Sequence, residues 1–276
     1  IGNVQELANK FNTLLISKHV PVRSLVIEKD NVYIKGYEAD TVTIINDLIS
    51  RVGNGLTGYR NAMGTWLQET PTVDCEEKES ILLDMFSKYD LALIYGAAGT
   101  GKTTLIKHLS SYFADSSKLF LANTNPAKEN LRRQIKVSNS EFSTIASCSP
   151  LVNGNNYDIV FIDECSTVDN AAMKELLKKL NCRLLVLVGD VYQIRSIKFG
   201  NWFSLARYFL PSNIVYELNT PYRSKHSSMV ELWNKVRSLD ERTEEYIAIQ
   251  HYASELDDSI FVREDSDEII LCLNYD

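Results

Sequence analysis

The clearest chemical signal in the sequence is a glycine-rich run that fits the pattern GxxxxGK[ST] in full: Gly96, Ala97, Ala98, Gly99, Thr100, Gly101, Lys102 and Thr103, with Thr104 next. Glycines let the backbone N–H groups curl around phosphate oxygens, and a helix that starts there adds partial positive charge. Lys102 can reach the β- and γ-phosphates of a nucleoside triphosphate, and the Thr103 hydroxyl can ligate Mg²⁺. An apolar run precedes the pattern and a helical pattern follows it, so we predict a phosphate-binding loop.

Two adjacent carboxylates, Asp163 and Glu164, come directly after the apolar run 159–162. We expect that run to be a strand next to the one that carries the loop. Asp163 can hold Mg²⁺ through water, and Glu164 can polarise the water that attacks the γ-phosphate. Because kinases that act on small molecules need no such second carboxylate, the pair favours hydrolysis.

Asp190 and Gln193 follow the next apolar run, at 184–188, which places them at the same edge of the predicted sheet. A glutamine side chain there can hydrogen-bond the γ-phosphate or the attacking water, and it can thereby report which nucleotide is bound. The GDxxQ pattern is weak alone and gains meaning from the two motifs before it.

The elements that must position these residues are short apolar runs at 91–95, 119–122, 159–162 and 184–188, each followed by a longer helical pattern. Runs without polar alternation are typical of strands buried on both faces of a parallel sheet. The predicted class is therefore α/β, with this domain at 71–215. Residues 1–70 read as a small α+β module, with helices at 4–15 and 42–52 and a hairpin at 25–36. Residues 216–276, with a last strand at 269–273, are predicted to begin a further domain.

Composition excludes several classes of protein. The 276 residues are 45% hydrophobic and 24% charged, which is ordinary for a globular chain. No apolar run approaches the roughly 18 residues that a membrane span needs. The net charge of −7 is local, because residues 216–276 hold 6 basic and 14 acidic residues, a balance of −8. Net charge therefore offers no argument for nucleic-acid binding, although it leaves room for a local basic patch.

The five cysteines are odd in number and widely spaced, and they form no CxxC or Cys/His cluster. We expect reduced thiols in a cytoplasmic protein and no zinc site. The chain opens at Ile1, with no initiator Met and without the pattern of a signal peptide, and we expect it to be a fragment of a longer protein.

Taken together, the motifs resemble those of superfamily 1 helicases of the UvrD/RecD-like kind, over roughly residues 72–224. Residues 96–103 are similar to helicase motif I, 163–166 to motif II and 189–194 to motif III. Residues 217–224 are similar to motif IV, whose arginine reaches the γ-phosphate, and that role falls on Arg223. The resemblance implies catalytic roles for Lys102, Glu164, Gln193 and Arg223, metal ligation by Thr103 and Asp163, and ATP with Mg²⁺ as the bound species.

The same resemblance implies a RecA-like first domain, with single-stranded DNA or RNA as a partner and no membrane. The residues that would contact nucleic acid are Asn123, Thr124, Asn125, Thr144 and Arg132. Since the family builds its ATPase site between two RecA-like domains, the remainder of the parent chain is the other expected partner. We therefore expect the 276 residues alone to bind nucleotide weakly and to hydrolyse it slowly, if at all.

Several readings stay open at this point. Arg132 lies on a basic helical face, with Lys128, Arg133 and Lys136, that is either a backbone track for nucleic acid or a solvated face paired with Glu129. Trp202 and Phe203 either stack on bases or, more in keeping with their helical spacing, belong to the core. The favoured function is an ATP-dependent helicase or translocase. The alternatives are an ATP-binding switch that regulates an attached effector without unwinding and, ranked last, a small-molecule kinase.

Overall fold

A computed structural model of the chain describes residues 4–29, 31–70, 73–192, 196, 198–220, 231–232, 234–236 and 242–250. The chain divides into two compact units, residues 1–223 and residues 224–276. The second unit contains the described helix α12 (Thr243–Ile249). The glycine-rich loop and the two adjacent carboxylates lie in the first unit.

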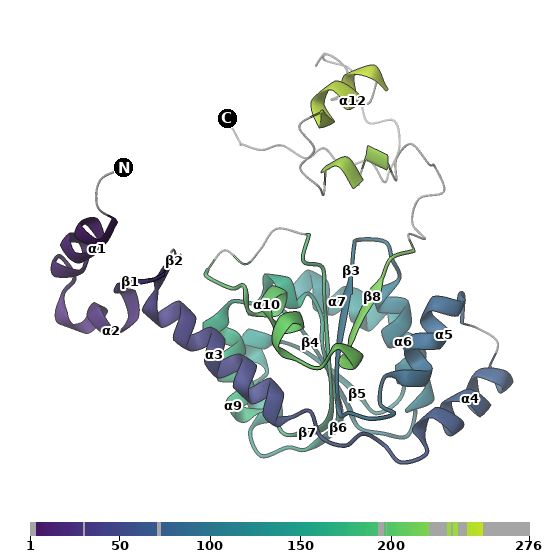
Figure 1. Cartoon of the computed structure of the whole chain (residues 1–276). Helices are drawn as coiled ribbons and strands as arrows, with labels where there is room; N and C mark the ends of the chain where they lie inside the picture. The colour runs from purple at the N-terminus through teal and green to yellow at the C-terminus, as the bar shows by residue number, and fades with distance from the viewer. Residues whose placement is uncertain are drawn as a thin grey trace, which may run out of the picture. The chain divides into compact units, whose positions relative to one another are not determined.

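A six-stranded parallel sheet lies at the centre of the first unit (Figure 1), with the strand order β5-β4-β6-β7-β3-β8. Its strands are β3 (Leu91–Gly96), β4 (Lys118–Ala122), β5 (Ser140–Thr144), β6 (Tyr157–Ile162), β7 (Cys182–Gly189) and β8 (Val215–Leu218). Every residue of β3 and β4 is buried. The predicted parallel sheet, and with it the α/β class, is confirmed.

Alternate residues of each central strand pack into two separate cores, because successive side chains of a strand point to opposite faces. Leu91, Leu93 and Tyr95 of β3 pack beneath α3 (Lys35–Ser50), α9 (Asn170–Lys179) and α10 (Trp202–Phe209). Ala92 and Ile94 face the other layer. That layer is made of α4 (Tyr59–Glu69), α5 (Glu76–Asp84), α6 (Lys102–Tyr112) and α7 (Asn125–Gln134).

The N-terminal segment consists of α1 (Val4–Thr13), α2 (Val20–Arg23), the antiparallel hairpin β1 (Leu25–Glu28) and β2 (Asn31–Ile34), and then α3. The hairpin agrees with the prediction, whereas α3 starts at Lys35 instead of near residue 42. The short helix α8 (Ser149–Val152) precedes β6. The predicted boundaries at 70 and 215 stay predictions, although residues 216–218 pair with β3 as part of the central sheet.

Helix α3 is fastened to the helical layer of the sheet as well as to the hairpin. Ile44 and Leu48 are fully buried in the core that α9 and α10 share. The Arg51 guanidinium donates to the carbonyls of Leu177 (2.7 Å) and Leu180 (3.2 Å) at the end of α9, where a helix leaves its carbonyl groups unpaired. A cation at this end also interacts favourably with the helix dipole.

Thr41→Val tests the contact between α3 and α9. The Asn170 amide nitrogen donates to the Thr41 hydroxyl oxygen at 2.7 Å, and both residues are buried. The variant keeps the β-branched shape but removes the acceptor, so we expect the free energy of unfolding to fall by about 1–2 kcal/mol in a urea titration. Thr43→Val is the control, because Thr43 also donates to the carbonyl four residues earlier but is exposed. Equal losses in the two variants would contradict the role of the Asn170 bond.

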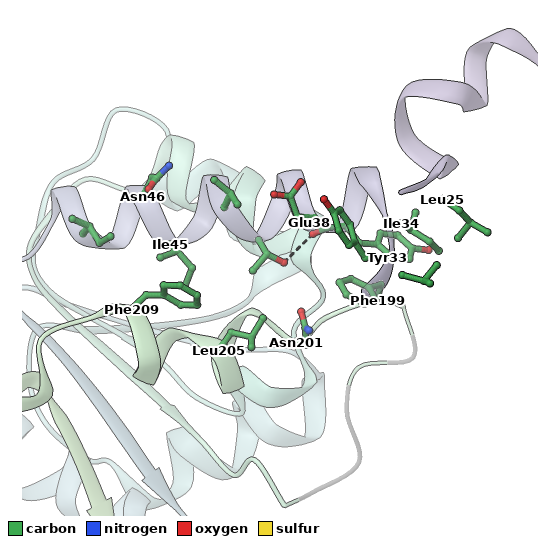
Figure 2. A pocket seen from close by; sticks show the side chains of 15 residues that line it. Leu25, Tyr33, Ile34, Glu38, Ile45, Asn46, Phe199, Asn201, Leu205 and Phe209 are labelled. Atoms are coloured by element: carbon green, nitrogen blue, oxygen red, sulfur yellow. Dashed lines mark hydrogen bonds between the residues drawn. The ribbon is translucent and has the colours of Figure 1, made fainter. Parts of the chain in front are cut away.

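A groove of about 830 Å³ opens between the hairpin, α3 and the region around α10 (Figure 2). Its lining is mainly apolar and includes Ile34, Ile45, Leu205 and Phe209. Tyr37 and Phe199 stack at its side, with ring centroids 4.1 Å apart. The lining includes no residue of the glycine-rich loop, so this groove is separate from the predicted nucleotide site.

Candidate functional site

The glycine-rich loop lies between the buried end of β3 and the start of α6, as the sequence predicts. Gly99 (φ +82°) and Gly101 (φ +84°) have left-handed backbone conformations, which residues other than glycine rarely adopt. Gly101 is the N-cap of α6, so the helix begins at Lys102. The first backbone N–H groups of a helix have no partner within it, and they are therefore available to an anion at the loop.

Gly96, the last residue of β3, lies so close to Thr100 and Leu218 that a larger residue would clash. A Cβ at this position would lie 2.6 Å from the Thr100 hydroxyl and 3.1 Å from Leu218 of β8. The Thr100 hydroxyl donates to the Ala97 carbonyl at 2.9 Å and closes the turn. Thr100 is buried, whereas Ala98 is exposed at the outside of the loop.

The Lys102 ammonium lies inside the loop, donating to the carbonyls of Gly96 (2.7 Å) and Ala97 (2.9 Å). Thr103 and Thr104 follow it on the first turn of α6, and both are partly buried. A lysine held at this point places a positive charge where the loop's N–H groups would receive phosphate.

Asp163 and Glu164 follow β6 at the same sheet edge as the loop, since β3, β6 and β7 run parallel. The expectation that β6 and β3 are neighbours was wrong, because β7 lies between them in the sheet. Nevertheless, the carboxylates lie close enough to Lys102 for its charge to lower both of their pKa values. Burial outweighs this effect and raises the pKa of Asp163, and burial together with the Asp163 charge raises the pKa of Glu164.

Glu164 has an unusual backbone for a residue with a side chain, with φ +54° and ψ +36°. This left-handed conformation costs roughly 1–2 kcal/mol for a residue other than glycine. Its N–H donates to the Asp163 carboxylate at 2.8 Å, and its carbonyl accepts from both the N–H and the hydroxyl of Thr167, each at 2.8 Å. The three hydrogen bonds hold the glutamate in a conformation that it would not adopt alone.

The raised pKa of Asp163 gives a prediction about stability. A carboxyl whose pKa is higher in the folded state favours folding when protonated, and that contribution disappears as the pH rises through the raised pKa. Asp163→Asn should therefore unfold at a higher temperature than the unmodified chain at neutral pH. The difference should shrink as the pH falls toward the ordinary aspartate value of about 3.9.

Asp158→Asn is the control with the opposite sign. The Ser117 N–H (2.7 Å) and hydroxyl (2.9 Å) donate to Asp158, and these bonds lower its pKa. Its contribution to stability is present at neutral pH and disappears as the pH falls through the lowered pKa, so Asp158→Asn should unfold at a lower temperature. Melting curves between acidic and neutral pH check both signs, and a loss of stability in Asp163→Asn at neutral pH would contradict the first.

The residues at this edge fit a magnesium ion. Thr103 and Asp163 offer a hydroxyl and a carboxylate oxygen, which are the hard donors that Mg²⁺ takes beside nucleotide phosphates. Burial without a cation disfavours the ionised form of Asp163, so a bound cation would favour it. Among the described residues, no three His, Cys, Asp or Glu side chains cluster as a metal site of their own.

The residues predicted to contact nucleic acid lie partly at the same edge. Thr124 is the N-cap of α7, and its hydroxyl oxygen accepts from the Ala127 N–H (3.3 Å). Thr144 is the N-cap of the short 3-10 helix Ile145–Ser147, and its hydroxyl oxygen accepts from the Ser147 N–H (3.3 Å). Thr144 is the last residue of β5, and Thr124 comes two residues after the end of the paired strand β4. Asn125 is exposed beside Thr124, whereas the Asn123 amide donates to Thr167.

Arg132 lies apart from that edge, on the exposed side of α7. Its guanidinium is 5.6 Å from the centre of the Phe142 ring, on the middle of β5. On the same helix, Lys128 contacts Glu129 at 3.2 Å, as in the solvated-face reading. Trp202 and Phe203 belong to the core, with exposures of 0% and 1%, and the Trp202 indole donates to the Val168 carbonyl at 2.9 Å.

Two further predicted residues, Gln193 and Arg223, and the predicted strand at 269–273 lie outside the described residues. Asp190 is buried at the end of β7 and accepts from the Tyr192 N–H at 2.9 Å.

Sequence reasoning missed Thr167 and also Glu77, whose carboxylate accepts from the N–H groups of Asn219 (2.9 Å) and Thr220 (3.4 Å) after β8. A polar residue four places beyond Asp163 was the only available signal for Thr167.

The described cysteines, Cys75, Cys148, Cys165 and Cys182, are free thiols. None of the described helices has both the length and the apolar character needed to cross a bilayer.

The chain is similar to one protein family in sequence and to several solved helicases in structure. The model of the family described as the AAA domain matches residues 77–256. No curated protein matches significantly. Among solved structures, a Pif1 helicase from Bacteroides in complex with ADP-AlF3 and ssDNA is 16% identical, with a TM-score of 0.48, and the match covers 71% of this chain and 52% of that one.

The Pif1 helicase from Candida albicans is 22% identical, with a TM-score of 0.43 and coverage of 60% and 44%. The PRRSV helicase is 16% identical, with a TM-score of 0.34 and coverage of 46% and 30%. The chain thus spans about half, or less, of the length of these structures. The family match spans about two thirds of this chain and includes the glycine-rich loop and both carboxylates. The chain belongs to the AAA domain family, and its glycine-rich loop and both carboxylates lie on a parallel α/β sheet.

Proposed function

We propose that this domain binds and hydrolyses ATP as the first motor domain of a superfamily 1 helicase or translocase. The main support is that Lys102 lies near Asp163 and Glu164 at one sheet edge, although they come from distant parts of the sequence. The charge of Lys102 acts to lower the pKa of both carboxyl groups. Ligands of open parallel α/β sheets bind at that edge.

Each residue has a distinct role in the proposed reaction. Residues 96–104 cradle the phosphates, and Lys102 neutralises charge that develops on the γ-phosphate. Glu164, whose raised pKa suits a proton acceptor better than an ordinary carboxylate, orients and deprotonates the attacking water. By the family resemblance, Gln193 and Arg223 respond to the γ-phosphate. Mg²⁺, when bound by Thr103 and Asp163, supplies further positive charge beside the phosphates.

The proposed track is single-stranded DNA or RNA. The Bacteroides Pif1 helicase structure contains ssDNA. In this chain the proposed track is the edge formed by Thr124, Asn125 and Thr144. Arg132 lies farther along α7 and contributes less in this proposal. The proposal also includes a second RecA-like domain in the rest of the protein and, given the free thiols, a cytoplasmic location.

Steady-state ATP hydrolysis by the complete protein tests the proposal, measured with and without single-stranded DNA and RNA, with Glu164→Gln as the blank. We expect one polymer to stimulate hydrolysis strongly and the variant to abolish the stimulated rate. Hydrolysis that depends on Glu164 but ignores both polymers would favour the switch over the helicase. Phosphate transfer to a small acceptor would favour a kinase.

A further inference from the structure

Glu164 is connected to Asn123, the first residue after β4, through the backbone and side chain of one residue, Thr167. The Thr167 N–H and hydroxyl both donate to the Glu164 carbonyl at 2.8 Å. The Asn123 amide in turn donates to the Thr167 carbonyl at 2.9 Å and to its hydroxyl oxygen at 3.2 Å. All three side chains are partly buried, and Asn123 thus spans two neighbouring strands of the sheet.

These bonds hold the backbone of Glu164, whose conformation sets the direction of its side chain. The backbone of Glu164 is left-handed, and a relaxation to the ordinary right-handed or extended region would turn the Cα–Cβ bond in a new direction. The Thr167 hydroxyl is a donor to Glu164 and an acceptor from Asn123 at once, so a shift of Asn123 changes the support of the Glu164 carbonyl. Asn123 adjoins Thr124 and Asn125, which the proposed function places on the nucleic-acid track.

We propose that Thr167 is a positioning residue for Glu164, and that Asn123 couples the nucleic-acid track to the glutamate through it. The inference rests on the proposed function and adds a path by which a bound strand changes the rate of hydrolysis. A strand that contacts Thr124 and Asn125 shifts the Asn123 amide, and the Thr167 bonds transmit that shift to the Glu164 carbonyl.

The first experiment separates positioning from packing. Thr167→Val keeps the side-chain shape and removes the hydroxyl, whereas Thr167→Ser keeps the hydroxyl and removes the methyl group. In the complete protein, we expect Thr167→Val to lower kcat for ATP about tenfold with KM nearly unchanged, and to lower the melting temperature no more than Thr41→Val does, since each variant removes one hydroxyl. Thr167→Ser should stay within about twofold of the unmodified kcat. Thr43→Val, an exposed helical threonine, is the control for the substitution itself.

The second experiment tests the coupling. Asn123→Ala removes both bonds to Thr167, and its effect is measured as the ratio of the hydrolysis rates with and without saturating polymer, so that weaker binding of the strand does not enter the result. The factor by which single-stranded DNA or RNA stimulates hydrolysis should fall severalfold. In the Thr167→Val background, Asn123→Ala should reduce stimulation less than in the unmodified protein, because the valine already lacks the hydroxyl that bonds to both Asn123 and Glu164 while the backbone bonds of residue 167 remain.

The outcomes distinguish this inference from the proposed function. An unchanged kcat in Thr167→Val, or a Thr167→Ser variant as impaired as Thr167→Val, would overturn the positioning role. Unchanged stimulation in Asn123→Ala would overturn the coupling. If no polymer stimulates the unmodified protein, the helicase function and the coupling both fail, and the Thr167 variants still decide the positioning. If the unmodified protein hydrolyses no more ATP than Glu164→Gln, the proposed function and the whole inference fail.

Discussion

Replacement of Lys102 by alanine is expected to reduce ATP hydrolysis by about a hundredfold to a thousandfold, the usual effect of removing a donor that stabilises transition-state charge. Nucleotide affinity should fall as well, because a charge-assisted hydrogen bond to phosphate is lost. The ammonium also bonds to the carbonyls of Gly96 and Ala97, so part of the loss reflects a less ordered loop.

Steady-state kinetics and titration with a fluorescent ADP analogue measure the two losses separately. Lys107→Ala is the matched control, since Lys107 is an exposed lysine on the same helix. A Lys102→Ala variant that hydrolyses ATP at the normal rate would remove the loop from the mechanism.

Glu164→Gln should separate binding from turnover. Glutamine has nearly the same shape but accepts no proton, so kcat should fall by about 10²–10⁴-fold while ADP affinity remains close to normal. The control is Glu175→Gln, which alters an exposed glutamate on α9. A Glu164→Gln variant with a normal kcat would move the base to another residue.

The pH profile adds a second check on the same residue. Because burial and Asp163 raise the pKa of Glu164, the acidic limb of the kcat profile should lie above the ordinary glutamate value of about 4.3. Hydrolysis requires the ionised base, so kcat should rise with pH along this limb. A Mg²⁺ ion at Asp163 would offset the Asp163 charge and move the limb toward lower pH. A direct titration of Glu164 in the metal-free chain that gave a pKa at or below the ordinary value would contradict the raised pKa.

The parts of the fold that the sequence predicts are those with local causes. The glycines of the loop are needed for positive φ angles at Gly99 and Gly101, and that need leaves a readable pattern. The four central strands are continuous apolar runs because both of their faces are buried. The edge strands β5 and β8, with sequences SEFST and VYEL, contain polar residues and were missed.

Other features arise from contacts between distant segments and have no local signal. The position of β7 between β3 and β6 is a matter of sheet order, which the runs themselves do not encode. The left-handed backbone of Glu164 could not be predicted either, because glutamate disfavours it and the stabilising Thr167 bonds form only in the fold. The support of Thr167 by Asn123 depends on the pairing of β4 with β6.

The docking of α3 has a practical consequence for any attempt to isolate the ATP-binding domain. A shortened chain that starts at residue 71, the predicted domain boundary, would lack Ile44, Ile45 and Leu48, which are buried against the layer of α9 and α10. Their removal would expose an apolar face to water, and such faces promote aggregation. The minimal soluble preparation of this domain should therefore retain α3, even though none of the residues proposed for ATP chemistry lies in it.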